Sequence, residues 1–399
     1  MILDKDRFME EGYLVLRNVI PPDRLASLRA AYETLVDRQR AIWAQSPSGN
    51  VWEISPQPRL ALDLTPELID DKTANTVECW LDDNTLGVSQ ELLAAPDAGV
   101  TQMMLMCNPV RDHGPANWHR DVHPIDTAPL EAYLLDLAEN GPRYVQWNIS
   151  LYDDDVLWVV PGSHLRINTE AEDRSILADP KAPVPGGVQT HLKGGDGVVY
   201  ILPILHWGSN YSTQLRRTIH GGYSNYTAYS NLAFVHHLSP ESRAAFERWA
   251  ARTERMKDHT EAALRAVIRR DGPAYLEALD RIHPGRGEQG KRLSTVYLCK
   301  AAFFIYLAKH PGLEDIPAPL HHAAKGGHPG TLNWGPDFAG RFSVEEADTL
   351  WQRFEIVDRR LQADEPFFEP GFQSGPMRYF FNRMPDELTV DRFIAGWGA

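Results

Sequence analysis

Three side chains in the middle of the sequence have the types and spacing of a mononuclear metal site. His119 and Asp121 stand two residues apart in the segment Asn-Trp-His-Arg-Asp. On a β-strand, residues i and i+2 point to the same side, so this imidazole and this carboxylate can hold one ion. A third ligand must come from elsewhere in the chain, and His206, at the end of an apolar run, is the best candidate. Two imidazoles and one carboxylate on one face of an octahedron form the facial site of non-haem Fe(II), in which three coordination positions stay open.

The His-x-Asp pair alone is weak evidence, and by itself it favours a surface histidine and a capping aspartate. Three nearby features favour the metal site instead. A strand end and turn, Val-Val-Pro-Gly-Ser-His, cover residues 159–164, and a Gly195-Asp196 turn precedes His206 by about one strand length. A basic pair, Arg216-Arg217, follows His206 by ten and eleven residues.

The region that carries these residues, from about 100 to 233, is rich in short β-type runs separated by Gly, Pro, Asn and Asp. Such spacing predicts a sandwich or barrel of many short strands. The predicted strands are Val100–Met106, Arg143–Leu151, Val156–Val160, Val198–Leu202 and Arg217–Tyr223. Because no glycine-rich phosphate fingerprint follows any of them, the sequence gives no support for a Rossmann or P-loop fold.

Helical periodicity flanks this region on both sides. Leu25, Leu28, Tyr32 and Leu35 recur at steps of three and four residues after Pro22, as one buried helical face requires. Further helices are predicted at 240–270, 293–309 and 344–361, with an irregular stretch at 364–399. We therefore expect a β domain with N-terminal helices at 1–239. A mostly helical extension at 240–399 is expected to pack on that core, and it could form a homodimer.

Composition limits the partners and the compartment. The chain has 399 residues, a formal net charge of −14 and 43% hydrophobic residues, which is ordinary globular composition. The acidic balance argues against nucleic-acid binding. The longest apolar stretches are only eight residues, too short for a membrane span. With three scattered cysteines and no signal-peptide pattern at the start, we expect a reduced, cytoplasmic, soluble protein.

Five motifs, taken in order, resemble the phytanoyl-CoA dioxygenase family of Fe(II)- and 2-oxoglutarate-dependent oxygenases. They are EEGYLVLRNVIPPDRLASLRAA, WHRD, VVPGSH, GDGVVYILPILHWGSN and LRRTIHGGY, and together they span roughly the first 230 residues. The resemblance implies a double-stranded β-helix (a cupin-like jelly roll) with His119, Asp121 and His206 as the catalytic iron ligands. It also implies an arginine that pairs with the distal carboxylate of 2-oxoglutarate, because a planar guanidinium matches a carboxylate bidentately.

The family pattern around that arginine selects Arg216 in Arg-Arg-Thr-Ile. Since the preceding loop is one residue shorter than in some members, Arg217 is the alternative. Gln102 resembles a glutamine that some members direct at the cosubstrate. The metal-binding aspartate, which some relatives replace by a small residue to admit a halide, is retained as Asp121, and this favours oxygenation over halogenation.

The resemblance further implies the reaction. With Fe(II), 2-oxoglutarate and O₂, the enzyme would hydroxylate an unactivated C–H bond of a small-molecule metabolite or natural-product intermediate and release succinate and CO₂. Desaturation, epoxidation and rearrangement remain alternative outcomes of the same iron chemistry. A catalytically silent jelly-roll binding protein is the alternative of another class, and retention of the three ligands and the arginine argues against it.

Overall fold

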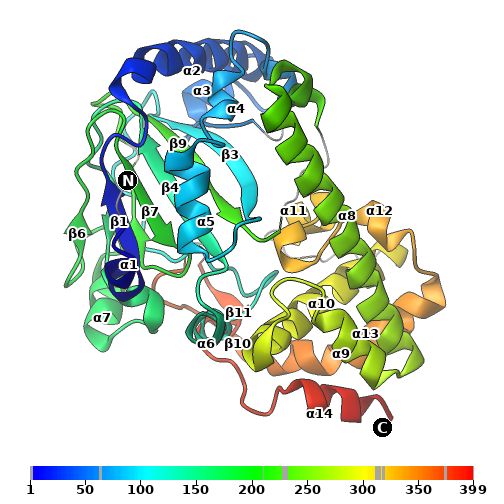
Figure 1. Ribbon diagram of the computed structural model, residues 1–399. Helices are drawn as coiled ribbons and strands as arrows, with labels where there is room; N and C mark the ends of the chain where they lie inside the picture. Colours follow the sequence, from blue (N-terminus) through cyan, green and yellow to red (C-terminus); the bar gives the residue numbers. More distant parts are fainter. Residues whose placement is uncertain are drawn as a thin grey trace. The chain divides into compact units, whose positions relative to one another are not determined.

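A computed structural model describes residues 3–62, 65–209, 211–226, 232–310, 316, 320–372 and 375–398 of the chain. The chain divides into two compact units (Figure 1). Unit 1 comprises Met1–Arg120, Tyr144–His164 and Asn168–Ala250, and unit 2 comprises Asp121–Arg143, Leu165–Ile167 and Ala251–Ala399. Because these units interleave along the chain, the division into 1–239 and 240–399 stays a prediction.

Unit 1 contains two antiparallel sheets. The larger has six strands in the order β1-β7-β4-β9-β3-β2, and the smaller has three in the order β6-β5-β8. The strands are β1 (Tyr13–Leu16), β2 (Arg59–Ala61), β3 (Gly99–Cys107), β4 (Tyr144–Ser150), β5 (Trp158–Val159), β6 (Val188–Gln189), β7 (Gly197–Ile201), β8 (His206–Trp207) and β9 (Arg217–Ser224). All five predicted strands are present, and the jelly-roll prediction is confirmed.

A hydrophobic cluster joins the two sheets from their facing sides. Tyr13 of β1 and Tyr200 of β7 pack there with Val159 of β5, and all three are buried. The opposite face of the large sheet is also buried. Successive side chains of β4 point to the two faces of the sheet in turn. Trp147 on that face is fully buried and donates to the Ser89 hydroxyl at 2.9 Å, so it is a core residue.

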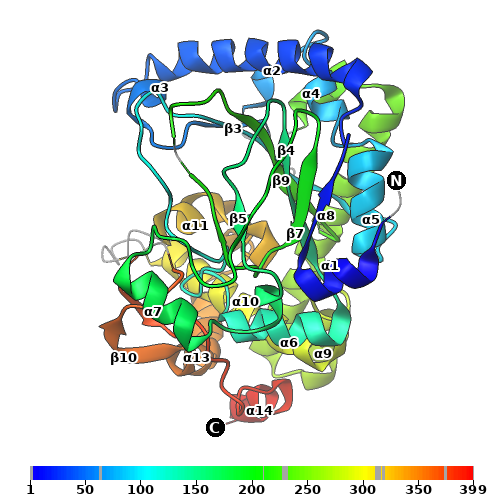
Figure 2. The ribbon, with the colours of Figure 1, turned by 90° about the vertical axis from the view of Figure 1, so that its left-hand side faces the viewer.

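Within unit 1, α5 lies beside that outer face, and α2 runs across one end of the strands (Figures 1 and 2). The helices that begin in unit 1 are α1 (Lys5–Glu11), α2 (Pro22–Trp43), α3 (Val51–Ile54), η1 (Pro66–Leu68), α4 (Asn75–Glu78), η2 (Asp83–Gly87), α5 (Val88–Leu92), η3 (Ser163–Leu165), α7 (Glu170–Ala178), η4 (Ala233–His237) and α8 (Pro240–Arg269). Of the four residues predicted for the buried face of α2, Leu28, Tyr32 and Leu35 are buried and Leu25 is half-buried. Tyr32 also donates to the Thr76 carbonyl oxygen at 3.0 Å.

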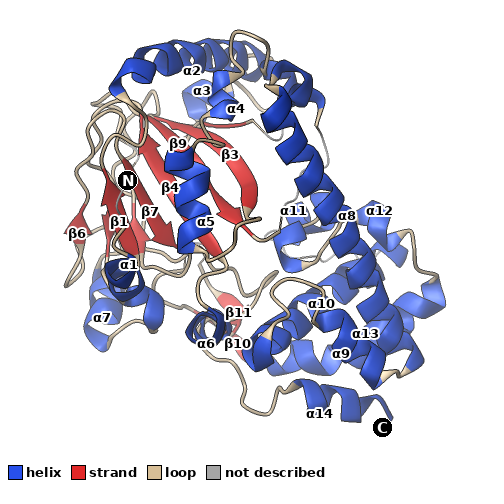
Figure 3. Cartoon of the chain, in the orientation of Figure 1, coloured by secondary structure: helices blue, strands red, loops and turns tan. Residues whose placement is uncertain are grey.

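Unit 2 is mostly helical (Figure 3). Its further elements are α6 (Leu130–Asn140), α9 (Gly272–Leu279), α10 (Gly287–Lys309), α11 (His321–Gly326), η6 (Pro329–Thr331), α12 (Pro336–Ala339), α13 (Val344–Arg360), β10 (Gln362–Phe367), β11 (Met377–Tyr379), α14 (Val390–Ala395) and η7 (Gly396–Gly398). The buried helix α10 contacts both α13 and α6. Among the described residues, no helix is long and apolar enough to cross a membrane.

The prediction of an irregular C-terminal stretch from 364 was wrong for much of its length. β10 pairs with β11 in an antiparallel hairpin, and α14 follows. The sequence Gln-Ala-Asp-Glu-Pro-Phe of β10 lacks the apolar alternation that marks a strand. Tertiary contacts stabilise the hairpin instead: the Tyr379 hydroxyl donates to Asp358 at 3.0 Å, and Lys300 contacts the same carboxylate at 2.8 Å.

His164, at the end of the Pro-Gly-Ser-His turn, gives unit 1 a predictable response to acid. Its side chain is fully buried, and Nε2 lies 3.0 Å from the Met9 carbonyl oxygen. Burial lowers the pKa of His164 from 6.5 to about 4. Between these values the unfolded chain binds a proton that the folded chain does not, so stability is lost as the pH falls from 6.5 towards 4.

We expect the free energy of unfolding, measured by urea denaturation, to fall between pH 7 and pH 5, with about 1–2 kcal/mol of the loss due to His164. His164→Gln should be less stable at pH 7 but should show a pH dependence smaller by that amount. Some dependence should remain, because burial also lowers the pKa of His283 to about 3. An unchanged pH dependence in His164→Gln would rule out this role.

Candidate metal centre

The backbone brings the two histidines together. His119 and His206 form an isolated antiparallel bridge, in which each N–H donates to the other residue's carbonyl oxygen at 2.9 Å. Residues directly opposite in such a pair lie side by side, and the imidazole centroids are 4.2 Å apart. The sequence predicts a regular strand for the His-x-Asp segment, but the structure holds this segment by the single bridge between His119 and His206.

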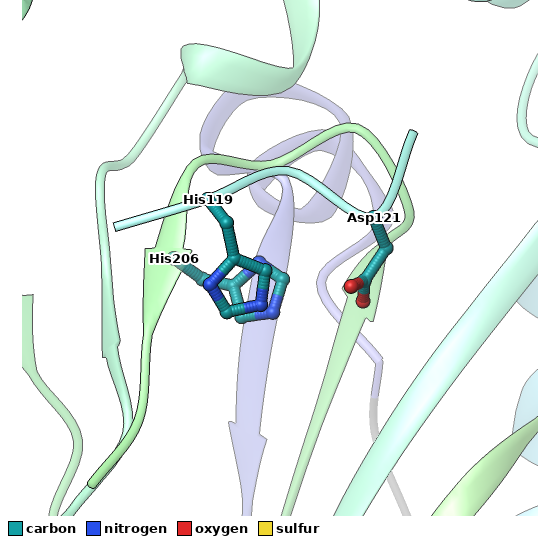
Figure 4. Close-up of side chains that lie close together, drawn as sticks. All are labelled: His119, Asp121 and His206. Atoms are coloured by element: carbon teal, nitrogen blue, oxygen red, sulfur yellow. The ribbon is translucent and has the colours of Figure 1, made fainter. Parts of the chain in front are cut away.

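Asp121 completes the group. One potential ligand atom from each of His119, Asp121 and His206 lies within 4.8 Å of the other two. In Figure 4 the two rings lie together, and the Asp121 carboxylate extends on the same side of the backbone. His206 is buried, whereas His119 and Asp121 are half-buried. The three residues selected from the sequence are thus close enough to hold one ion.

Hydrogen bonds at Nδ1 set the tautomer of both imidazoles. Nδ1 of His119 lies 2.8 Å from the Asn117 carbonyl oxygen, and Nδ1 of His206 lies 3.0 Å from the Ile204 carbonyl oxygen. A carbonyl oxygen only accepts, so Nδ1 must carry the proton and Nε2 keeps its lone pair. A backbone carbonyl on the second ring nitrogen is the usual companion of a metal-ligating histidine. The donor set therefore fits a divalent transition metal.

Arg120, between the two predicted ligands, holds the His-x-Asp segment in place by buried hydrogen bonds. It is only 1% exposed, and Nη1 donates to the carbonyl oxygens of Ser163 at 2.7 Å and Pro203 at 2.5 Å. Nε and Nη2 both donate to Asn168 Oδ1. Because Ser163 ends the Pro-Gly-Ser turn and Pro203 precedes His206, these bonds tie three motifs together. Sequence reasoning missed this role, and an arginine in a half-polar segment gives no signal for it.

The inner face of the large sheet carries a polar patch that sequence reasoning also missed. The Gln146 amide donates to the Tyr200 hydroxyl at 2.8 Å, and His220 Nδ1 lies 2.6 Å from Asn148 Oδ1. The Tyr200 ring centroid is 5.5 Å from that of His206, so this patch faces the histidine pair. The sequence did carry a signal for this patch, because polar and apolar residues alternate along β4. Both the polar and the apolar side chains of this strand are mostly buried, so its polar face is not a solvent-exposed face.

Gln102 lies on the same inner face. On β3 it is opposite Gly222 of β9, and Gly222 is in turn opposite Gln146 of β4. Its amide donates to the Met104 sulfur at 3.7 Å. This placement is compatible with the predicted approach to a cosubstrate.

The two candidate arginines differ in what occupies their donors. Arg217 donates to Glu33, to Asn108 Oδ1 and to the Arg216 carbonyl oxygen. Arg216 donates through Nε to Asp154 Oδ2 at 2.8 Å, and among the described residues neither of its terminal nitrogens has a hydrogen-bond acceptor. Arg216 also lines a cavity of about 310 Å³.

That cavity belongs to unit 1 and is lined by acidic and aromatic side chains beside Arg216. The lining residues are Asp153, Asp154, Asp155, Val156, Trp158, Gln189, Trp207, Ser209, Tyr211, Thr213, Gln214 and Arg216. Trp207 also stacks on Trp118, with ring centroids 5.4 Å apart. Asn210, in the motif that follows His206, lies outside the described residues.

Comparison with models of known protein families identifies the family of this chain. The family model described as phytanoyl-CoA dioxygenase matches residues 8–219, more than half of the chain. The chain belongs to the phytanoyl-CoA dioxygenase family. The resemblance seen in the sequence motifs is thereby confirmed, and the protein is an Fe(II)- and 2-oxoglutarate-dependent oxygenase of that family. No curated protein matches the chain.

The chain is also similar to solved structures, and the match extends over most of the length of three of these. AviO1 from Streptomyces viridochromogenes Tue57 is 21% identical, with a TM-score of 0.40, and the match covers 55% of this chain and 92% of that one. EctD from S. alaskensis, in its apoform, is 20% identical at a TM-score of 0.40, covering 56% and 77%. EvdO2 from Micromonospora carbonacea var. aurantiaca, complexed with 2-oxoglutarate, is 20% identical at 0.38, covering 56% and 91%.

Proposed function

We propose that the protein is a dioxygenase that hydroxylates an unactivated C–H bond of a small molecule and converts 2-oxoglutarate and O₂ to succinate and CO₂. The observation that carries the proposal is the convergence of two imidazoles and one carboxylate within 4.8 Å. His119, Asp121 and His206 would hold Fe(II), the ligand set that leaves three positions for cosubstrate and O₂. The bound iron would supply the oxidation, and the chain would supply geometry and a dry pocket.

Arg216 is proposed as the residue that binds the distal carboxylate of 2-oxoglutarate. Its terminal nitrogens have no acceptor among the described residues and it lines the cavity, whereas the Arg217 donors are occupied. Bidentate pairing of a guanidinium with a carboxylate adds both energy and orientation. We propose Gln102 as a second polar contact to the cosubstrate.

The substrate is proposed to be a small-molecule metabolite or natural-product intermediate. The net charge of −14 makes a polyanionic substrate less favourable. Cytoplasmic localisation and a homodimer formed through the C-terminal helices stay predictions.

Succinate formation tests the proposed activity. Purified protein given Fe(II), O₂ and 1-¹⁴C-labelled 2-oxoglutarate should release succinate and ¹⁴CO₂. The release should be slow without a substrate and faster when a panel of small metabolites includes one that the enzyme oxidises. Mass spectrometry of the product should show a gain of one oxygen atom. A loss of two hydrogens would instead indicate desaturation, and a complete lack of 2-oxoglutarate turnover across the panel would contradict the proposal.

A further inference from the structure

Asp154 is a buried carboxylate for which the proposed reaction has so far given no role. It is 7% exposed and follows β4 within the Asp153-Asp154-Asp155 run. Oδ2 accepts hydrogen bonds from Arg216 Nε and from the Thr218 hydroxyl, each at 2.8 Å. A carboxylate removed from water costs free energy unless it is paired, so this arrangement is a specific pairing and not a surface contact.

The Asp154 side chain is itself firmly fixed. Its N–H and carbonyl oxygen pair reciprocally with Leu192, each bond at 2.9 Å, and the Val156 N–H donates to Oδ1 at 3.0 Å. Burial alone would raise the pKa of Asp154, but Arg216, the Val156 N–H and Thr218 together lower it below 3.8. The group is therefore a fixed anion at neutral pH.

The contact uses one particular edge of the Arg216 guanidinium. A guanidinium offers five N–H donors in a planar fork, of which Nε supplies one. Because Asp154 takes Nε, the edge formed by Nη1 and Nη2 is left without an acceptor among the described residues. The backbone of Arg216 is fixed as well, since its N–H donates to Asn108 Oδ1 at 3.1 Å.

We propose that Asp154 is the positioning residue of the cosubstrate site: it holds Arg216 by Nε so that both terminal nitrogens face the distal carboxylate of 2-oxoglutarate. The inference rests on the proposed function of Arg216. Thr218 of β9, two residues after the arginine, donates to the same Asp154 carboxylate and fixes its rotamer. Pre-orientation of a guanidinium reduces the entropy lost when the second carboxylate binds.

This proposal makes a prediction opposite in sign to simple electrostatics. 2-Oxoglutarate is a dianion, so removal of a nearby negative charge should tighten its binding if charge alone mattered. If Asp154 acts by positioning, the same removal should weaken binding. Asp155 provides the matched control: it lines the same cavity and its side chain is exposed. Its carboxylate accepts no hydrogen bond from the described residues, so Asp155→Asn removes the same charge without touching Arg216.

Anaerobic titration of the Fe(II)-loaded protein with 2-oxoglutarate, followed by the visible charge-transfer band, measures the dissociation constant without turnover. Asp154→Ala should raise this constant roughly ten- to a hundredfold, by analogy with the loss when the hydrogen-bond partner that orients a metal ligand is removed. Asp154→Asn, which keeps the shape, should show a smaller increase. Asp155→Asn should leave the constant unchanged or lower it. Binding of pyruvate, which lacks a distal carboxylate, should be equal in all four proteins.

Combination with Arg216→Ala separates positioning from general damage. If Asp154 acts through Arg216, Asp154→Ala should add nothing to the loss already caused by Arg216→Ala. Additive losses, weaker pyruvate binding in Asp154→Ala, or an unchanged or tightened 2-oxoglutarate constant in both Asp154 variants would each overturn the inference. Failure of the wild-type protein to bind 2-oxoglutarate would instead contradict the proposed function itself.

Discussion

Replacement of Asp121 by alanine is expected to abolish 2-oxoglutarate turnover. Asp121 provides the only carboxylate of the three-residue group, and its oxygen lies within 4.8 Å of the histidine nitrogens. Two imidazoles alone lack the anionic ligand of the facial set, so Fe(II) should be released and succinate formation should drop to background. Succinate release and tightly bound iron after gel filtration are the two measurements.

Asp112→Ala is the control for Asp121→Ala. Asp112 is an exposed aspartate in the preceding loop, where it accepts a hydrogen bond from the Gly114 N–H at 2.8 Å. Its variant should retain iron and turnover. Full succinate release by Asp121→Ala would overturn the assignment of the ligand set.

Arg216→Ala is expected to weaken 2-oxoglutarate binding by roughly 2–5 kcal/mol, or about thirtyfold to several-thousandfold in the dissociation constant. The distal carboxylate would be left in the pocket without its partner, and the Asp154 carboxylate would lose its guanidinium as well. Iron binding should be preserved, because Arg216 is not among the three grouped residues. The effect therefore differs from that of Asp121→Ala, which removes the metal.

Arg217→Ala is the matched comparison. Arg217 forms an ion pair with Glu33 at 3.1 Å, so its loss should lower the melting temperature and leave the 2-oxoglutarate constant nearly unchanged. If Arg217→Ala instead causes the large loss in binding, the register of the arginine motif is displaced by one residue.

Much of the fold could be predicted from the sequence because local patterns and tertiary packing agree. β-Rich runs bounded by Gly and Pro became β3, β4, β5, β7 and β9, and the three-to-four-residue spacing of Leu28, Tyr32 and Leu35 became the buried face of α2. The β10–β11 hairpin could not be found this way. Its strands are stabilised by Asp358, near the end of α13, and by Lys300 of α10, and the hydrogen bonds of these side chains leave no periodic signal in the sequence.

The candidate site likewise has residues that could be predicted from the sequence and residues that could not. His119, Asp121 and His206 could be selected because metal binding demands particular residue types, and the family motifs fixed their spacing. The supporting contacts could not: Arg120 and Asp154 act through bonds to carbonyl oxygens and side chains that only the folded chain brings near. Buried polar groups must find partners, but the sequence does not say which ones.

A crystal grown anaerobically with Fe(II) and 2-oxoglutarate tests the central claim most directly. We predict an iron anomalous peak within bonding distance of Nε2 of His119, Nε2 of His206 and the Asp121 carboxylate, with the distal carboxylate of 2-oxoglutarate on the terminal nitrogens of Arg216. An iron peak at other residues, or no peak in crystals that retain the folded protein, would contradict the account.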